Sequence, residues 1–146
     1  MPSPRKLRRL GGSEGRLLLA TVGRLVWVRL GLWLAPVPTL RRYSREAEAA
    51  TPAAPPAQRP SADEVAWSVR AASRYVPGAT CLCQALTARA VLNNLGYPTT
   101  LRLGVLKEPS GRLTAHAWLE SNGQVVVGQR GDLAAYTVLP SLAGQR

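Results

Sequence analysis

The sequence predicts an α+β fold in which two helices precede a small antiparallel sheet. Apolar residues recur at helical spacing over residues 61–95 and alternate with other residues from residue 99 onward, which indicates a change from a period of 3.6 to a period of 2. Asn122-Gly123 then separates two alternating stretches, and this dipeptide is a strong hairpin signal. Helices followed by hairpin-connected strands are typical of the α+β class.

The N-terminal third holds most of the positive charge. Residues 1–46 contain ten Lys or Arg and two Asp or Glu, out of a net charge of +11 for the whole chain. Residues 1–15 combine this charge with Pro and Gly, so we expect a mobile arm. Nucleic acid is not an expected partner, because the aromatic residues are not interleaved with basic ones as a base-stacking surface requires.

Residues 16–35 are predicted to form an apolar helix that packs on the domain. Arg24 and Arg29 interrupt the apolar run, and a charge at the centre of a bilayer costs about 2.5–3.5 kcal/mol, so a spanning helix is unfavourable. We expect the arginine side to face water. The alternative is an interfacial membrane helix anchored by Trp27 and Trp33. No small-residue cleavage site follows the run, and this favours a cytoplasmic protein over a secreted one.

Three parts of the chain are expected. Residues 1–43 form the basic arm and apolar helix, residues 44–60 form a Pro/Ala-rich linker, and residues 61–146 form the main domain. The linker has too little apolar content to pack into a core.

The main domain is expected to open with two helices. Ser61 and Glu64 have the spacing of a capping box, which predicts a helix start there, and Pro77-Gly78 follows its end. The second helix begins at Cys81 and is apolar on nearly every side, so it should be central and buried. Gly96 supplies its left-handed stop, and Pro98 prevents continuation.

The strands are predicted from alternating residues after Gly96. They cover residues 99–105, 113–120 and 124–127, with a short edge strand over residues 136–139. In the second strand one face carries Leu113, Ala115, Ala117 and Leu119, and the other carries Thr114, His116, Trp118 and Glu120.

Cys81 and His116 are the candidate catalytic pair. Cys81 lies where a helix begins, and unpaired amides at a helix start stabilise a thiolate and can stabilise an oxyanion. His116 is the only histidine, and packing the helix on the sheet is expected to bring it near Cys81 as general base. Cys83 points about 200° away on the helix and is interpreted as a structural residue. Two such cysteines and one histidine predict neither a disulfide nor a metal site, and no cofactor is expected.

The motifs around these residues resemble one known family. The chain is similar to the transglutaminase-like cysteine proteases that act as stand-alone leader peptidases in lasso-peptide biosynthesis. The resemblance covers about residues 61–140 and rests on Thr80-Cys81-Leu82, Ala85-Leu86, Gly96-Tyr97-Pro98, Leu103-Gly104-Val105 and His116-Ala117-Trp118-Leu119-Glu120.

The resemblance implies a papain-like arrangement with the cysteine on a central helix, the histidine on a strand, and an acid on or after the next strand. It implies that the protein removes the leader from a ribosomally made precursor peptide. A small leader-recognition protein would present this substrate, and a lasso cyclase would use the freed amine. The competing interpretation is a non-catalytic scaffold that binds a peptide or partner proteins. Acyl transfer to an amine is a third possibility.

The third catalytic residue is where the chain departs from the family. The family commonly has an Asp about twelve residues after the histidine, and Gly128 stands there in this chain. A tight hairpin would place His116 opposite Gln129, and one extra residue would place it opposite Gly128. We expect Asp132 to orient His116, with Gln129 as the alternative; Glu120 is interpreted as a solvated strand end.

Overall fold

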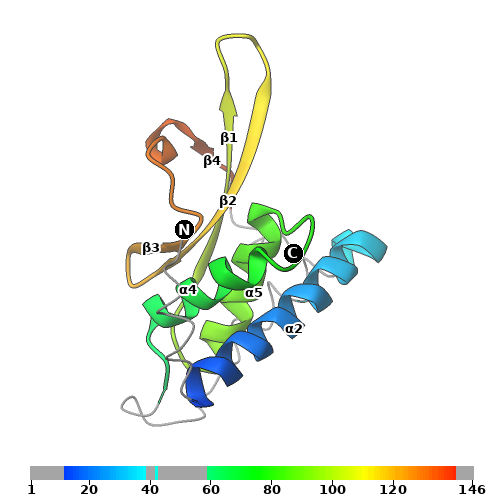
Figure 1. Ribbon diagram of the computed structural model, residues 1–146. Helices are drawn as coiled ribbons and strands as arrows, with labels where there is room; N and C mark the ends of the chain where they lie inside the picture. The colour runs from blue at the N-terminus through cyan, green and yellow to red at the C-terminus, as the bar shows by residue number, and fades with distance from the viewer. Residues whose placement is uncertain (1–11, 39–41, 43–58, 141–146) are drawn as a thin grey trace.

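The predicted α+β class is confirmed. The structure is a computed structural model, and it describes residues 12–38, 42 and 59–140. The sheet is four-stranded and antiparallel, in the order β3-β2-β1-β4, and α2, α4 and α5 lie below and beside it (Figure 1). The elements are α2 (Gly12–Leu34), α4 (Ala62–Ser73), α5 (Cys81–Asn94), β1 (Thr100–Lys107), β2 (Leu113–Ser121), β3 (Gln124–Val127), the 3-10 helix η3 (Leu133–Ala135) and β4 (Thr137–Val138).

The expected arm and linker lie largely outside the described residues. The exceptions are residues 12–15 of the arm, which belong to α2 and are helical, and residues 59 and 60 at the end of the linker.

The helix starts and stops follow the signals in the sequence. Ser61 Oγ accepts from the Glu64 amide at 3.2 Å, and Glu64 Oε2 accepts from the Ser61 amide at 2.7 Å, which confirms the capping box. Thr80 caps α5 by accepting from the Cys83 amide at 3.3 Å. After α5 the chain turns at Gly96 with φ +82, the left-handed conformation expected there.

The sheet has the expected hairpin and one irregularity. Asn122 and Gly123 both have positive φ, as a tight hairpin turn requires. Beyond the turn, Glu120 pairs with Val125, but Leu119 pairs with Val127. Val126 is therefore an extra residue, and this β-bulge shifts the register of everything that follows it in β3. The predicted edge strand is confirmed as β4, which pairs with β1.

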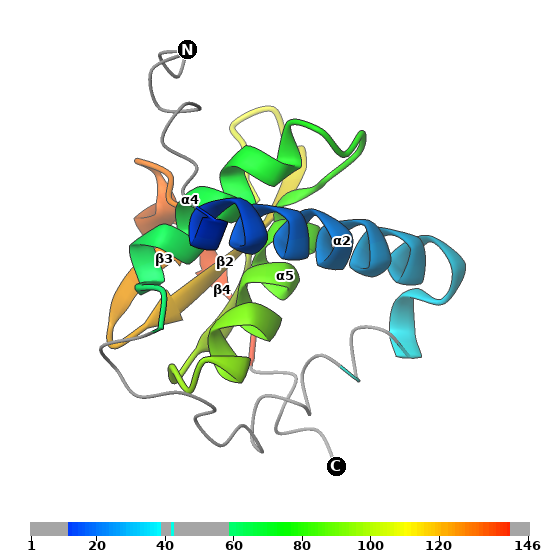
Figure 2. The same ribbon diagram turned by 60° about the horizontal axis from the view of Figure 1, so that its bottom comes forward.

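Helix α5 lies between two apolar clusters. On one side Ala85, Ala88 and Leu92 pack against Ala117 and Leu119 of β2. On the other side Cys83 and Leu86 pack with residues of α2 and α4. Figure 2 shows α2 lying across this side of the domain. The helix is therefore buried on both sides, as its apolar sequence predicts.

Helix α2 packs on the domain, which confirms one expectation and corrects another. Leu25 and Val28 are fully buried against α4 and α5, and Thr21 Oγ1 lies 3.2 Å from Ser68 Oγ of α4 in the same buried region. Of the two arginines expected to face water, Arg24 is exposed and Arg29 is half-buried. The side that faces water is mainly apolar, since Trp27 and Leu19 are among its most exposed residues. Arg24 and Arg29 are five residues apart, so their side chains point in different directions around the helix and cannot both lie on one exposed face.

We predict that removing the buried contact of α2 destabilises the whole domain. Leu25→Ala should lower the free energy of unfolding by about 2–5 kcal/mol, because it leaves a cavity between α2 and α5. Leu19→Ala is the matched control, and its effect should stay within about 0.5 kcal/mol because that side chain is exposed. Urea unfolding measured by circular dichroism tests this, and equal small effects for both variants would show that α2 is not part of the core.

Candidate active site

Cys81 is the first residue of α5 and carries a free, half-buried thiol. The start of this helix is held by Thr80, and Gln84 Nε2 donates to Ala79 O at 3.0 Å. The amides of Cys81 and Leu82 lie in the first turn, where an α-helix provides no acceptor for them. Amides in this position attract negative charge, so the geometry suits both a thiolate and an oxyanion next to it.

Cys83 is held in a different environment two residues later. Its side chain is fully buried, and Sγ donates to Leu25 O of α2 at 3.7 Å. Burial raises the pKa of the Cys83 thiol to about 11, and the positive charge of Arg29 opposes this shift only in part. A thiol in this state is a poor nucleophile. The structural interpretation of Cys83 is therefore confirmed.

The His116 ring is fixed by a backbone carbonyl. His116 is only 9% exposed in the middle of β2, and its Nε2 lies 2.7 Å from Gly128 O. A carbonyl oxygen only accepts hydrogen bonds, so Nε2 must carry the hydrogen. In the neutral ring this leaves Nδ1 with a free lone pair, which is the state a general base needs.

Position 128, whose carbonyl oxygen points at His116, accepts only a glycine. Its φ is +86, and an added Cβ would lie 2.7 Å from Ala117 O and 2.9 Å from Trp118 Cβ. Neither the backbone conformation nor the space accommodates a side chain. Gly128 stands at the position where the resembling family commonly has Asp, and in this chain it presents a carbonyl oxygen to the histidine.

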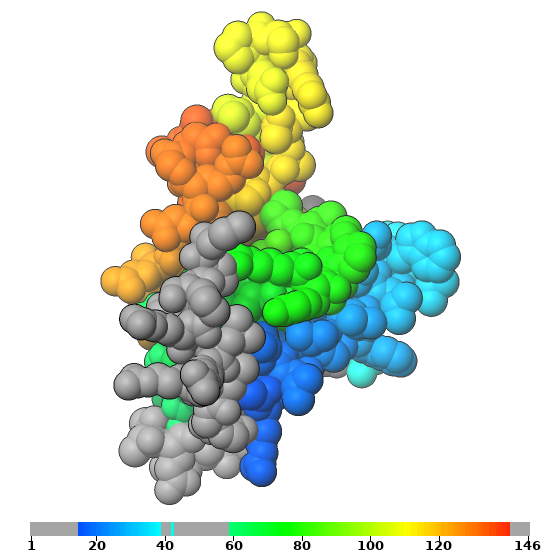
Figure 3. All heavy atoms as spheres, in the orientation of Figure 1, coloured from blue at the N-terminus to red at the C-terminus, as the bar shows by residue number. Residues whose placement is uncertain are grey.

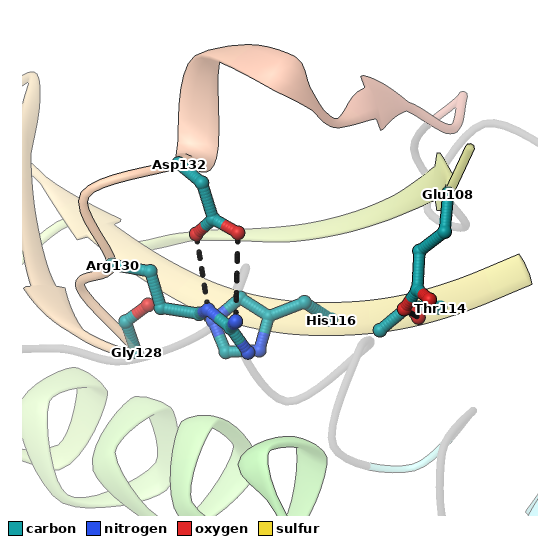
Figure 4. A network of polar contacts seen from close by, with 6 residues as sticks. All are labelled: Glu108, Thr114, His116, Gly128, Arg130 and Asp132. Atoms are coloured by element: carbon teal, nitrogen blue, oxygen red, sulfur yellow. Dashed lines mark hydrogen bonds and ion pairs between the residues drawn. The ribbon is translucent and has the colours of Figure 1, made fainter. Parts of the chain in front are cut away.

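Among the described residues, neither of the two orienting residues expected from the sequence forms a hydrogen bond with His116. Asp132 forms an ion pair with Arg130, with Nε 3.1 Å from Oδ1 and Nη2 3.5 Å from Oδ2, and both side chains are partly exposed (Figure 4). Gln129 is exposed, and none of the described residues forms a hydrogen bond with its side chain. The described hydrogen bond of His116 is therefore with Gly128, while the carboxylate of Asp132 pairs with Arg130.

Two aromatic rings that were not expected at the site border His116. The Trp118 ring stacks at a centroid distance of 6.1 Å, and the Tyr136 ring lies at 5.8 Å. Trp118 Nε1 donates to Glu120 Oε1 at 3.1 Å, so Glu120 is not the solvated strand end that was expected. The alternating pattern of the sequence already placed His116, Trp118 and Glu120 on one face of the strand. Nothing in the sequence indicated that Tyr136 would lie beside them.

The Cys81 thiol and the His116 imidazole are not in hydrogen-bonding contact. Side chains alternate along β2, so the imidazole lies on the face opposite Ala117 and Leu119, which pack on α5. Tyr136 and Trp118 share the imidazole face, where both approach Gly104. Within residues 59–140, no hydrogen bond connects the Cys81 thiol with the imidazole. The site therefore consists of a thiol at a helix start and a separately fixed base.

The described residues offer no metal site. In the ranges 12–38, 42 and 59–140, no three side chains of His, Cys, Asp or Glu gather closely enough to hold an ion.

One comparison with known proteins found a relationship. A family model described as the transglutaminase-like superfamily matches residues 25–141, which is well over half of the chain and includes both Cys81 and His116. No curated protein and no solved structure matches the chain.

We predict that neutral His116 carries its hydrogen on Nε2. Nitrogen-15 NMR of the ring at alkaline pH should show the Nε2–H form, because Gly128 O can only accept. The Asp132→Asn variant should give the same spectrum, since that carboxylate binds Arg130 instead. An Nδ1–H form, or a change of form in the Asp132 variant, would contradict the geometry.

Proposed function

Since this chain belongs to the transglutaminase-like superfamily, which includes cysteine proteases, we propose that it is a cysteine peptidase that removes the leader from a ribosomally made lasso precursor peptide. The observation that carries the proposal is the position of Cys81 at the first residue of α5, capped by Thr80. A nucleophilic thiol gains most from a helix dipole in that first turn.

The proposed reaction has two steps. His116 Nδ1 takes the proton of the Cys81 thiol, and the thiolate attacks the scissile carbonyl while amides of the first turn of α5 stabilise the oxyanion. The imidazolium gives its proton to the leaving amine, and an acyl-enzyme remains. Water then attacks with His116 as base and releases the Cys81 thiol. Gly128 O keeps Nε2–H in place, which is the role expected from Asp132 or Gln129.

This mechanism requires the imidazole to approach Cys81 when a peptide binds. Catalytic hydrogen bonds are often long or unaligned in free enzymes and tighten only with substrate. His116 lies beyond the pairing of β3 with β2, which ends at Leu119, but it is still paired with Gly104 of β1. Its ring faces away from α5, so the approach to Cys81 requires this part of β2 to rearrange when the peptide binds.

The lasso precursor is proposed from the combination of short motifs. The short motifs resemble those of the leader peptidases of that pathway: Cys81-Leu82, Ala85-Leu86, Leu103-Gly104-Val105 and His116-Ala117-Trp118. With them come the proposed partners, namely the leader segment, a small leader-recognition protein and a lasso cyclase, and a cytoplasmic location.

A non-catalytic scaffold is the second candidate function. Two observations favour it: the thiol and the imidazole are not hydrogen-bonded to each other, and a neutral carbonyl stands in place of the family's carboxylate. A scaffold would bind the precursor without cleaving it.

We predict that cleavage of the precursor depends on Cys81 and His116. In a mass-spectrometric assay with the leader-recognition protein present, Cys81→Ala should abolish leader release, and His116→Ala should slow it by about 10²-fold or more. Hydrolysis gives a leader with a free carboxylate, whereas acyl transfer gives a leader joined to the amine, so the product mass separates the two.

Two variants serve as controls for that assay. Cys83→Ala should still cleave, because its thiol is buried against α2. Asp132→Asn should cleave within about threefold of the unmodified chain, because its carboxylate pairs with Arg130. Cleavage by Cys81→Ala would refute the assignment of the nucleophile. Binding of the precursor without cleavage by the unmodified chain would establish the scaffold.

A further inference from the structure

The outward side of α2 is a continuous apolar strip. Leu19 is 74% exposed, Trp27 70%, Trp33 72% and Leu34 72%. Figure 3 shows α2 along the surface of the molecule, with its C-terminal end protruding beyond the other elements. Single exposed apolar residues are ordinary on a protein, but a row that follows one helix for several turns marks an interaction surface. The outward strip comprises Leu19, Val26, Trp27, Leu30, Trp33, Leu34 and, just past the helix, Val37.

The two arginines within the length of the strip, Arg24 and Arg29, lie beside it rather than in it. Arg24 lies at the side of the strip, where both of its terminal nitrogens donate to the side-chain oxygen of Asn94 on α5. Arg29 turns toward the domain and lies against Gly78, and its charge acts on buried Cys83. The two charges that disfavour a spanning helix therefore do not interrupt the strip.

Basic residues flank the strip in the sequence. Arg16 is exposed in the N-terminal part of α2. Four basic residues precede the helix and three follow it closely: Arg5, Lys6, Arg8, Arg9, Arg41, Arg42 and Arg45. An apolar strip with tryptophans and positive flanks matches a bilayer with anionic headgroups, since each cation near such a surface adds about 1 kcal/mol.

We propose that α2 lies in the interface of an anionic membrane, with the outward strip among the acyl chains and the basic residues at the headgroups. Trp27 and Trp33 act as the interfacial anchors. A second copy of the chain is a poor occupant of the strip, because it would bring the positive flanks of two molecules together.

A spanning orientation does not suit this helix. Residues Gly15–Leu34 are long and apolar enough to cross a bilayer, with a mean hydropathy of 1.6. Yet Thr21, Leu25 and Val28 are fully buried against α4 and α5, and insertion would strip this contact from the domain. Lying in the interface keeps the buried side in place and covers only the exposed one.

Flotation of the purified full chain with vesicles tests the proposal. The chain should float with vesicles that contain about one-third phosphatidylglycerol and bind vesicles of phosphatidylcholine alone at least about tenfold more weakly. Addition of about 0.5 M NaCl should weaken the binding, because the headgroup attraction is screened. Tryptophan fluorescence should shift to the blue on binding, as Trp27 and Trp33 leave water.

A double variant isolates the strip. Trp27→Gln with Trp33→Gln should lower the partition coefficient by about tenfold or more and keep the circular dichroism spectrum, since both side chains are exposed. Leu113→Gln is the matched control: it removes an apolar residue that is 67% exposed on β2, and it should bind like the unmodified chain.

Several outcomes would overturn the proposal. These are a failure to float with either vesicle, equal binding by the double variant, and self-association of the free chain in place of vesicle binding. Retention in the membrane after alkaline carbonate extraction would also overturn it, because that result identifies a spanning helix. None of these outcomes depends on peptidase activity, so the result stands whatever the fate of the proposed function.

Discussion

The burial of α5 on both sides is the constraint on which the rest of the structure depends. The sheet takes one side of the helix through Ala117 and Leu119, and α2 takes the other through Leu25. Residues two positions apart on a helix point about 200° away from each other, so Cys81 and Cys83 meet different surroundings. The Cys81 thiol lies at the first turn of α5, next to its unpaired amides, whereas the Cys83 thiol is buried against α2. The same packing turns the opposite side of α2 outward.

A backbone oxygen sets the state of the histidine. The bulge at Val126 and the positive φ of Gly128 direct a carbonyl at His116 Nε2. A carbonyl fixes the ring and its tautomer as a carboxylate would, but it offers a dipole in place of a full charge. The imidazolium formed during proton transfer is therefore stabilised less directly than in a triad with Asp, and both candidate functions have to account for this difference.

The strongest local signals of the sequence predicted the fold well. The capping box at Ser61, the stop at Gly96 and the hairpin at Asn122-Gly123 each specify backbone geometry through one or two residues, so they could be read without tertiary information. The bulge at Val126 could not, because it depends on how both strands pack. Of the two residues expected opposite His116, the structure places Gly128 in contact with the imidazole. The orienting group was missed for a related reason, since every residue has a carbonyl and side-chain chemistry does not mark the one that is used. Periodicity also could not show which side of α2 would be buried, because that helix is apolar nearly all round.

The central claim is that the Cys81 thiol and the His116 imidazole work together. The most direct measurement is the rate of alkylation of Cys81 between pH 6 and 8, followed by peptide mass mapping, in the unmodified chain and in His116→Gln. The account predicts rapid modification of Cys81 below pH 8 and a rate at least about tenfold lower in the variant, because the base that removes the thiol proton is gone. Equal rates in both proteins would show that the imidazole does not act on this thiol and would contradict the account.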